Sequence, residues 1–154
     1  MNPTMKLGYL LQHSASVLGR QSDQVLQERL GIGISQYRIL MMLRHNANVQ
    51  QRKLAECLGQ TEASISRQIK LLCEKGLLST RVNPSSRREH LAVPTAKGVK
   101  VTEAAVEVLT QYHQPVLDGL TDKQRQALLE TLTMFHSRIC MPSRPFACDH
   151  PFTI

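Results

Sequence analysis

The sequence contains no tryptophan, and aromatic residues make up only 4% of its 154 positions. Its core must therefore be built mainly from aliphatic side chains and methionine. No apolar run approaches the length of a membrane span, and the N-terminus lacks the apolar segment of a signal peptide. With 42% hydrophobic and 20% charged residues, we expect one globular domain, or one domain with dimerising extensions, that works in the cytoplasm without a membrane partner.

Motifs of catalytic chemistry are also missing. The sequence has no glycine-rich phosphate loop, no nucleophile elbow, no HExxH motif and no pair of carboxylates at a spacing typical of acid–base catalysis. An enzymatic function is therefore not predicted, and no cofactor is expected.

Positive charge is concentrated in the middle third of the chain. Residues 50–100 contain ten Lys or Arg against four acids, which gives this segment a net charge of +6, while the whole chain carries +7. Residues 1–49 carry +3, and residues 101–154 carry −2. This focus favours a polyanion as partner. The cations are not arranged along one long amphipathic helix, which argues against an anionic membrane surface.

Hydrophobic periodicity predicts a mainly α-helical chain of the α+β class. A long first helix is expected from Met5 to about Leu30, followed by a break at 31–33. Ser35 is predicted to cap the second helix, and a short third helix should cover 50–58. A further long helix should run from Thr95 to about residue 113, before a proline at 115.

The last helix is predicted to open with a capping box at residues 121–124. Its apolar residues recur at helical spacing and should line a buried face: Leu128, Leu132, Phe135 and Ile139. Prolines keep the final stretch of the chain irregular.

The segment Gln60–Gly76 is predicted to form a helix that binds in the major groove of DNA. A glycine turn at Gly59 precedes it, Thr61 can cap it, and Gly76 can end it. Its apolar residues form one stripe, and its other side presents small polar groups followed by cations. That face suits a DNA major groove. The alternative is an ordinary amphipathic helix with a solvated face.

A β-hairpin is predicted directly after this helix. The period changes after Gly76, and residues 77–82 look like a strand. Asn83-Pro84-Ser85-Ser86 is a strong turn signal, and residues 90–93 form the return strand. Arg87 and Arg88 lie at or just after the tip, where they suit the negative potential of a narrow minor groove.

The order of these elements resembles that of the MarR family of bacterial transcription regulators, which have a winged helix-turn-helix fold. The resemblance covers roughly residues 5–140 by element order, and its specific motifs span residues 51–98. The matching residues are Gln51–Gly59 (QRKLAECLG), Ser64–Arg67 (SISR), Leu71–Leu78 (LLCEKGLL), Arg81, Arg87-Arg88 and Thr95–Gly98 (TAKG).

The resemblance implies a homodimer that binds double-stranded, pseudo-palindromic DNA. Residues 1–34 and 114–154 would form the dimerisation region, and residues 35–113 the DNA-binding lobe with its connecting helix. Each subunit would place 61–75 in a major groove and the hairpin wing in the flanking minor groove. Binding is predicted to repress nearby genes until a small ligand or oxidation releases the protein. A protein-interaction module that uses the amphipathic terminal helices is the alternative.

The resemblance also identifies candidate DNA contacts. Arg67 matches an arginine that the family keeps in its recognition helix, and Arg88 matches the wing arginine of its Asp-x-Arg motif. Ser86 stands at the aspartate position and cannot hold that arginine by charge. The candidate DNA-binding residues are Arg52, Gln60, Thr61, Glu62, Ser64, Ser66, Arg67, Gln68, Lys70, Arg87 and Arg88.

Two further sets of residues are candidate sites. In the family, a cavity between the dimer helices and the DNA lobe often binds aromatic ligands, and the candidates for its lining are Tyr9, His13, Tyr37 and His45. The cysteines of the helix-turn-helix, Cys57 and Cys73, are expected to be small core residues. The C-terminal spacing H-x3-C-x7-C-x-H suits either a zinc ion or a redox switch, and its members are His136, Cys140, Cys148 and His150. The favoured alternative is that these residues have no special role, because spacing alone is weak evidence.

Overall fold

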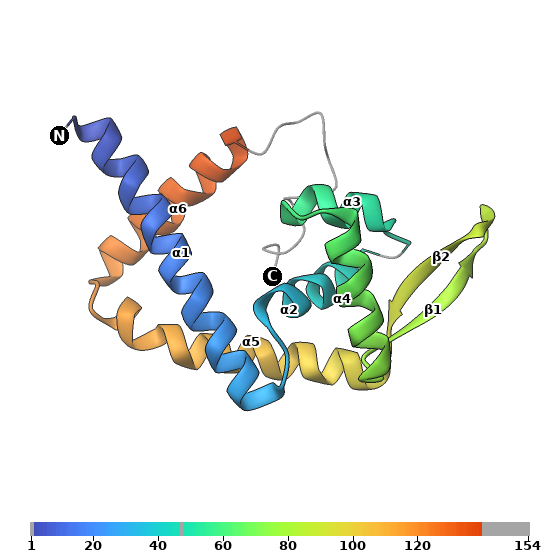
Figure 1. The fold of residues 1–154 in the computed structure, drawn as a ribbon. Helices are drawn as coiled ribbons and strands as arrows, with labels where there is room; N and C mark the ends of the chain where they lie inside the picture. The colour runs from blue at the N-terminus through green and yellow to red at the C-terminus, as the bar shows by residue number, and fades with distance from the viewer. Residues whose placement is uncertain (1, 47, 140–154) are drawn as a thin grey trace.

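The computed structural model describes residues 2–46 and 48–139 of the chain. Within that part it contains six helices and one two-stranded antiparallel sheet (Figure 1). The elements are α1 (Pro3–Leu30), α2 (Ile34–His45), α3 (Gln51–Leu58), α4 (Glu62–Glu74), β1 (Leu78–Asn83), β2 (Ser86–Pro94), α5 (Ala96–Asp118) and α6 (Asp122–Ile139).

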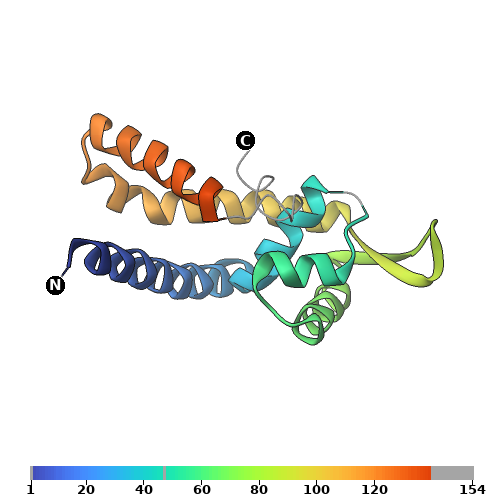
Figure 2. The same cartoon turned by 90° about the horizontal axis from the view of Figure 1, so that it is seen from above.

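The elements form two groups joined by α5. Figure 1 shows α1 and α6 at one end of the molecule and α2, α3, α4 and the hairpin at the other, with α5 running beneath both. Seen from above, α1 lies in one layer and α5 with α6 in a second layer, and the hairpin projects away from the helices (Figure 2). The predicted α-rich fold with one hairpin is confirmed.

The core is aliphatic, as the composition requires, and lies where α1, α2, α3, α4 and α5 meet. Leu26, Ile39, Leu54, Ile65 and Leu72 are fully buried in it. Each of these residues belongs to the apolar stripe of a helix whose opposite side is polar. Burial of the apolar stripes packs the helices against one another.

The first helix begins two residues earlier than predicted. Pro3 occupies its first turn, where the missing N–H of proline costs nothing, and Asn2 Oδ1 accepts a hydrogen bond from the Thr4 N–H (2.8 Å). The helix ends at Gly31, whose φ of 65° is the left-handed conformation that glycine adopts without strain.

The predicted cap of α2 is wrong. Ile34 is already helical and Gly33 is the N-cap residue, so Ser35 lies inside the first turn. Two side chains replace the missing serine cap: Asp23 Oδ1 accepts from the Ile34 N–H (2.8 Å), and Gln36 Oε1 accepts from the Gly33 N–H (3.4 Å). Ser35 is thereby left to accept a hydrogen bond from Gln60, in the turn between α3 and α4.

The predicted end of the long helix before Pro115 is also wrong, because α5 continues through this proline to Asp118. A proline removes one backbone hydrogen bond, here the one that would reach the Gln111 carbonyl. Gln111 is exposed, so water can replace that bond. A side-chain hydrogen bond from Gln114 Nε2 to Asp118 Oδ1 (2.7 Å) spans the proline.

The face of α6 that was predicted to be buried is partly exposed in the single chain. Leu128, Leu132 and Phe135 are each 40–44% exposed, and the side chain of Ile139 lies outside the described part. The spacing of these residues is that of a packed stripe, but residues 2–46 and 48–139 provide no core surface that covers it. Apolar residues of α1 are exposed at the same end of the molecule: Met5, Leu7, Leu10 and Leu18.

A threonine and a glycine attach the start of α5 to the end of α4. Thr95 Oγ1 donates to the Gly76 carbonyl (2.7 Å) and accepts from the Gly98 N–H (3.0 Å). The backbone N–H of Thr95 donates to the Leu77 carbonyl (3.1 Å). A Cβ atom on Gly98 would lie 2.0 Å from the Leu77 oxygen, a distance at which backbone atoms must move apart. The TAKG motif is therefore a close contact between two backbone segments.

Replacing Gly98 should destabilise the fold. We expect Gly98→Ala to lower the free energy of unfolding by about 1–3 kcal/mol, because overpacking forces the backbone apart. Urea denaturation followed by circular dichroism measures this change. Gly8→Ala is the matched control, since its Cβ would meet no atom within 4 Å. Equal stability of Gly98→Ala and the unaltered protein would contradict the steric argument.

Candidate nucleic-acid interface

The helix α4 forms where the sequence predicts it and buries one side. Thr61 is its N-cap residue, and the Thr61 Oγ1 atom accepts a hydrogen bond from the Ser64 N–H (3.1 Å). Ile65, Ile69 and Leu72 are buried against the core. The opposite side is exposed to solvent, and it carries Glu62, Ser66, Arg67 and Lys70.

Two glycines in the left-handed conformation set the ends of this helix. Gly59, with φ of 61°, turns the chain from α3 into α4, and Gly76, with φ of 70°, turns it from α4 toward β1. Both turns match the sequence prediction. They place α3 and α4 in contact as the two helices of a helix-turn-helix, followed at once by the hairpin (Figure 1).

The exposed side of α4 keeps its positive charge available. Within residues 2–46 and 48–139, neither Arg67 nor Lys70 forms an ion pair. Arg52 on α3 differs, because its Nε atom lies 3.4 Å from Glu56 Oε1. This pair is exposed and therefore weak, so Arg52 can exchange the carboxylate for a phosphate at low cost.

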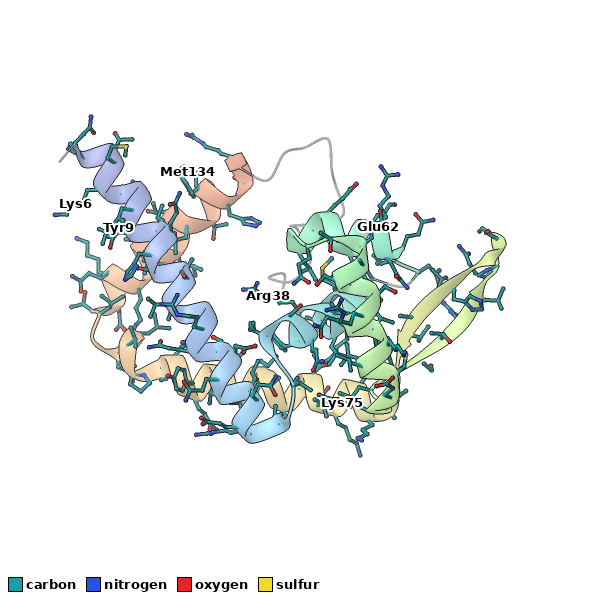
Figure 3. The ribbon with its side chains drawn as sticks, in the orientation of Figure 1. Lys6, Tyr9, Arg38, Glu62, Lys75 and Met134 are labelled. Carbon is teal, nitrogen blue, oxygen red and sulfur yellow. The ribbon has the colours of Figure 1, made fainter. Side chains whose placement is uncertain are left out.

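The first turns of α3 and α4 and the strand β2 meet at a surface hollow of about 430 Å³. Its lining includes two of the predicted residues, Arg52 and Glu62, together with Gln50, Gln51, His90 and Leu91. Figure 3 shows Glu62 at the end of α4 that adjoins α3. The two glutamines and His90 are not among the predicted DNA contacts, although Gln51 begins the QRKLAECLG motif, because they become neighbours only when β2 folds back.

The hairpin places the two wing arginines directly after its turn. β1 and β2 pair from Leu78↔Pro94 to Val82↔His90, and the register then shifts so that Asn83 faces Ser86. Residues 87–89 therefore form an irregular part of β2. The strand β2 itself starts at Ser86, four residues earlier than predicted. The side chains of Arg87 and Arg88 lie outside the described part, so their role stays a prediction.

Another arginine of the wing contacts the loop before α3. The Arg81 guanidinium donates to Asn48 Oδ1, and Asn48 has a φ of 66°. Asparagine tolerates this left-handed conformation better than most residues do. The family motif includes Arg81 without giving it a role, and in the structure its side chain connects β1 of the wing to the loop before α3.

Two of the residues predicted to contact DNA, Gln60 and Gln68, form hydrogen bonds with other side chains of the protein. Gln60 donates from Nε2 to Ser35 Oγ (2.7 Å) and accepts at Oε1 from Ser64 Oγ (3.1 Å). Gln68 accepts at Oε1 from Gln36 Nε2 (3.0 Å). These residues connect α4 to α2, whereas Ser66, Arg67 and Lys70 form the outward face.

The four residues predicted to line an effector cavity are not brought together. Tyr9 and His13 stack on each other on α1, with ring centroids 5.4 Å apart. Tyr37 is half-buried against the core, and burial raises the pKa of its phenol. His45 is the exposed last residue of α2. None of the four lines the surface hollow that the structure shows between α1 and α2.

That hollow has a volume of about 500 Å³ and a positive lining. Arg20 and Arg38 contribute two guanidinium groups, while the Asp23 carboxylate is bonded to the backbone of Ile34. Figure 3 shows Arg38 on α2 and Tyr9 on the distant N-terminal half of α1. The remaining lining residues are small or polar: Ala15, Ser16, Gly19 and Gln24.

The cysteines of the helix-turn-helix pack against the core as predicted. Cys57 and Cys73 are partly buried beside it. Burial, with the neighbouring Glu74 carboxylate, raises the pKa of the Cys73 thiol, which disfavours a reactive thiolate. Of the predicted zinc or redox set, only His136 is described, on α6; Cys140, Cys148 and His150 lie outside the described residues.

A helix-turn-helix is followed by a β-hairpin wing, and its second helix carries cations that form no ion pair among the described residues. This is the architecture of a winged helix-turn-helix DNA-binding protein. A model of the MarR family matches residues 30–89, which contain both helices and most of the wing. The chain is 25% identical over 131 residues to the HTH-type transcriptional regulator YdgJ of Bacillus subtilis (strain 168), covering 85% of this chain and 77% of the relative.

Two solved structures share the fold. The MepR–DNA complex of S. aureus superposes with a TM-score of 0.70 and 23% identity, covering 86% of this chain and 97% of MepR. CouR from Rhodococcus jostii RHA1 bound to p-coumaroyl-CoA gives a TM-score of 0.69 and 24% identity, covering 84% and 90%. Residues 30–89 are thus similar to the MarR family of transcriptional regulators, and the chain shares the fold of MepR and CouR. No helix in the described part is long and apolar enough to cross a membrane.

Removing a cation from the outward face of α4 should weaken DNA binding. We expect Arg67→Ala to raise the Kd roughly ten-fold and to reduce the slope of log K against log salt by about 0.9, the value for one phosphate contact. Gel shifts at several salt concentrations measure both quantities. Arg138→Ala removes the same charge from α6 and should have little effect. Unaltered affinity in an Arg67→Ala/Arg88→Ala double variant would contradict docking of α4 and the wing on DNA.

Proposed function

We propose that this protein is a homodimeric repressor that binds a pseudo-palindromic operator in the cytoplasm and is released by a small ligand. The observation that carries the proposal is the outward face of α4, where Ser66, Arg67 and Lys70 are exposed and the two cations have no acidic partner among the described residues. Small donors combined with cations suit base edges and phosphates of a major groove.

The proposed DNA contacts come from α4, α3 and the wing, and each of these parts contacts a different feature of the DNA. Ser66 and Arg67 are placed to contact bases, with Thr61, Glu62 and Ser64 at the first turn and Lys70 beside the backbone of the DNA. Arg52 binds a flanking phosphate from α3. Arg87 and Arg88 enter the minor groove from the wing.

Dimerisation is supported by the exposed apolar residues of the terminal helices. Leu128, Leu132 and Phe135 form a stripe on α6 that no core surface in the described part of the chain covers. Residues 1–34 and 114–154 would provide the dimer contact, and residues 35–113 the DNA-binding lobe. The second boundary falls inside α5, which continues from one region into the other. A side-chain hydrogen bond between Ser22 and His113 (3.1 Å) fixes α1 against α5 at this point.

A charge placed in the α6 stripe should produce a monomer. We expect Leu132→Glu to halve the mass measured by light scattering and to weaken binding to a two-half-site duplex roughly a hundred-fold, because the second half-site then adds no avidity. Circular dichroism should show that the DNA lobe remains folded.

Ser137→Glu is the control for this experiment. Ser137 is exposed on the opposite side of α6, so the same charge there should leave the dimer intact. A dimeric Leu132→Glu protein would show that α6 does not carry the interface.

The hollow between α1 and α2 is the proposed effector site. Its two arginines favour an organic anion, and the small side chains of Ala15 and Gly19 leave room for an apolar group beside the charge. The related protein CouR was solved with p-coumaroyl-CoA, which combines these features. The thiol of Cys73 is poorly suited to oxidative release because its pKa is raised.

Release by an aromatic carboxylate or its coenzyme A thioester should depend on Arg38. We expect p-coumarate or p-coumaroyl-CoA to displace the operator in fluorescence anisotropy, and Arg38→Gln to raise the half-effective concentration about ten-fold, the loss expected for one charged hydrogen bond. Arg29→Gln, on the exposed end of α1, is the charge-matched control. An equal response of the two variants would rule out the α1–α2 hollow as the site.

The central test of DNA recognition is selection of bound duplexes from a random pool by the unaltered protein. Enrichment of a sequence with two related half-sites supports the proposal. A folded dimer that enriches no sequence at low salt would favour the alternative function, a protein-interaction module that uses the terminal helices.

A further inference from the structure

A single buried glutamine connects three parts of the molecule. Gln36, in the first turn of α2, is only 6% exposed. Its Oε1 atom accepts hydrogen bonds from the Gly33 N–H (3.4 Å) and from Lys75 Nζ (3.3 Å), and its Nε2 atom donates to Gln68 Oε1 (3.0 Å). The Lys75 ammonium also donates to the Gly31 carbonyl at the end of α1. Figure 3 shows Lys75 at the end of α4 that is remote from Glu62.

These bonds determine which way the Gln36 amide faces. A side-chain amide has one oxygen with two acceptor sites and one nitrogen that donates. Both acceptor sites of Gln36 are occupied by donors, so its nitrogen has to face α4. A buried amide without a hydrogen-bond partner is destabilising, because it has lost its hydration and nothing replaces it. Breaking the bond to Gln68 is therefore unfavourable.

The neighbouring residue makes a second connection to the same helix. Ser35 Oγ accepts from Gln60 Nε2 (2.7 Å), and Gln60 Oε1 accepts from Ser64 Oγ (3.1 Å) in the first turn of α4. The helix α4 is therefore held by side chains of α2 near its start, and by Gln36 at its middle and its end. Buried apolar contacts press α4 against the core, but they are not directional. The hydrogen bonds are directional, so they fix the rotation of α4 about its own axis.

We infer that Gln36 is a positioning residue for DNA recognition. Through Gln68 and Lys75 it holds α4 at the rotation at which Ser66 and Arg67 face a base pair, so discrimination between DNA sequences depends on it. Gln68 directly follows Arg67, and a small rotation of α4 would move both side chains relative to the groove. The inference rests on the proposed role of α4 in base recognition.

The experiment compares specific with non-specific binding. Duplexes enriched by the unaltered protein from a random pool serve as the operator, and a scrambled duplex of equal length serves as the non-specific probe. Gln36→Met keeps the side-chain volume and removes the amide. We expect the ratio of the two Kd values to fall about three- to ten-fold, the range for one lost hydrogen bond, with little change in non-specific binding, which depends on charge.

A double-mutant cycle separates positioning from a general structural role. If Gln36 acts through Gln68, the effect of Gln36→Met on the Kd ratio should largely disappear when Gln68→Met is already present. Gln111→Met, on the exposed surface of α5, is the matched control. Gln36→Asn retains an amide but is one methylene too short to reach Gln68, and it provides the same test if the methionine variant does not fold.

Each outcome is decisive. A folded Gln36 variant with reduced discrimination that is coupled to Gln68 supports the inference. Unchanged discrimination, or an equal loss of specific and non-specific binding, overturns it. If the unaltered protein enriches no sequence, the proposed repressor function fails, and the inference fails with it. This outcome differs from failure of the inference alone, because in that case the unaltered protein still discriminates between sequences.

Discussion

The contact between Gly98 and the Leu77 carbonyl is the constraint on which the arrangement of the DNA lobe depends. There the start of α5, the turn after α4 and the first strand of the wing approach so closely that no Cβ atom fits. Thr95 adds hydrogen bonds to the same turn. Because α4 ends and β1 begins within this contact, the direction of the wing relative to α4 is set by backbone atoms. The resulting angle between them is independent of the long side chains that would contact DNA.

The helix α5 transmits this rigid arrangement to the other end of the molecule. It is continuous from Ala96 to Asp118 despite Pro115, and an ion pair between Arg44 and Glu103 (2.8 Å) links it to α2. A dimer built on the terminal helices would therefore hold two copies of α4 at a spacing governed by the lengths and contacts of α1 and α5. That spacing, and not any side chain of α4, would select the distance between half-sites.

Local signals in the sequence predicted the parts of the fold whose causes are local. Gly59 and Gly76 adopt the left-handed turns that their positions indicated, and Thr61 and Thr95 cap the helices as expected. The failures concern residues whose role depends on distant partners. Ser35 had the chemistry of a cap, but Asp23 and Gln36 satisfy that helix end and Ser35 bonds to Gln60 instead. Pro115 had the chemistry of a helix stop, but an exposed helix surface tolerates one missing bond.

In the candidate DNA interface, too, roles with local causes could be predicted and roles that depend on distant partners could not. The outward face of α4 follows from its 3.6-residue period, so Ser66, Arg67 and Lys70 could be selected from sequence alone. The inward roles of Gln60 and Gln68 could not, because a glutamine at the edge of a polar face has equal reason to face solvent or a neighbouring helix. Gln36 has one recognisable signal, its position three residues after a glycine that starts a helix. Its hydrogen bonds, however, are to Gln68 and Lys75, which lie 32 and 39 residues further along the chain.

One consequence concerns how a ligand could act on DNA binding. Asp23 and Ile34 line the hollow between α1 and α2, and the hydrogen bond between them begins the same helical turn that contains Gln36. An anion bound by Arg20 and Arg38 would lie beside the Asp23 carboxylate and repel it. A shift of that carboxylate changes the only side-chain bond described for the Ile34 N–H, two residues from Gln36. The proposed effector site and the proposed positioning residue Gln36 thus share one turn of α2, and a small displacement of that turn would couple them.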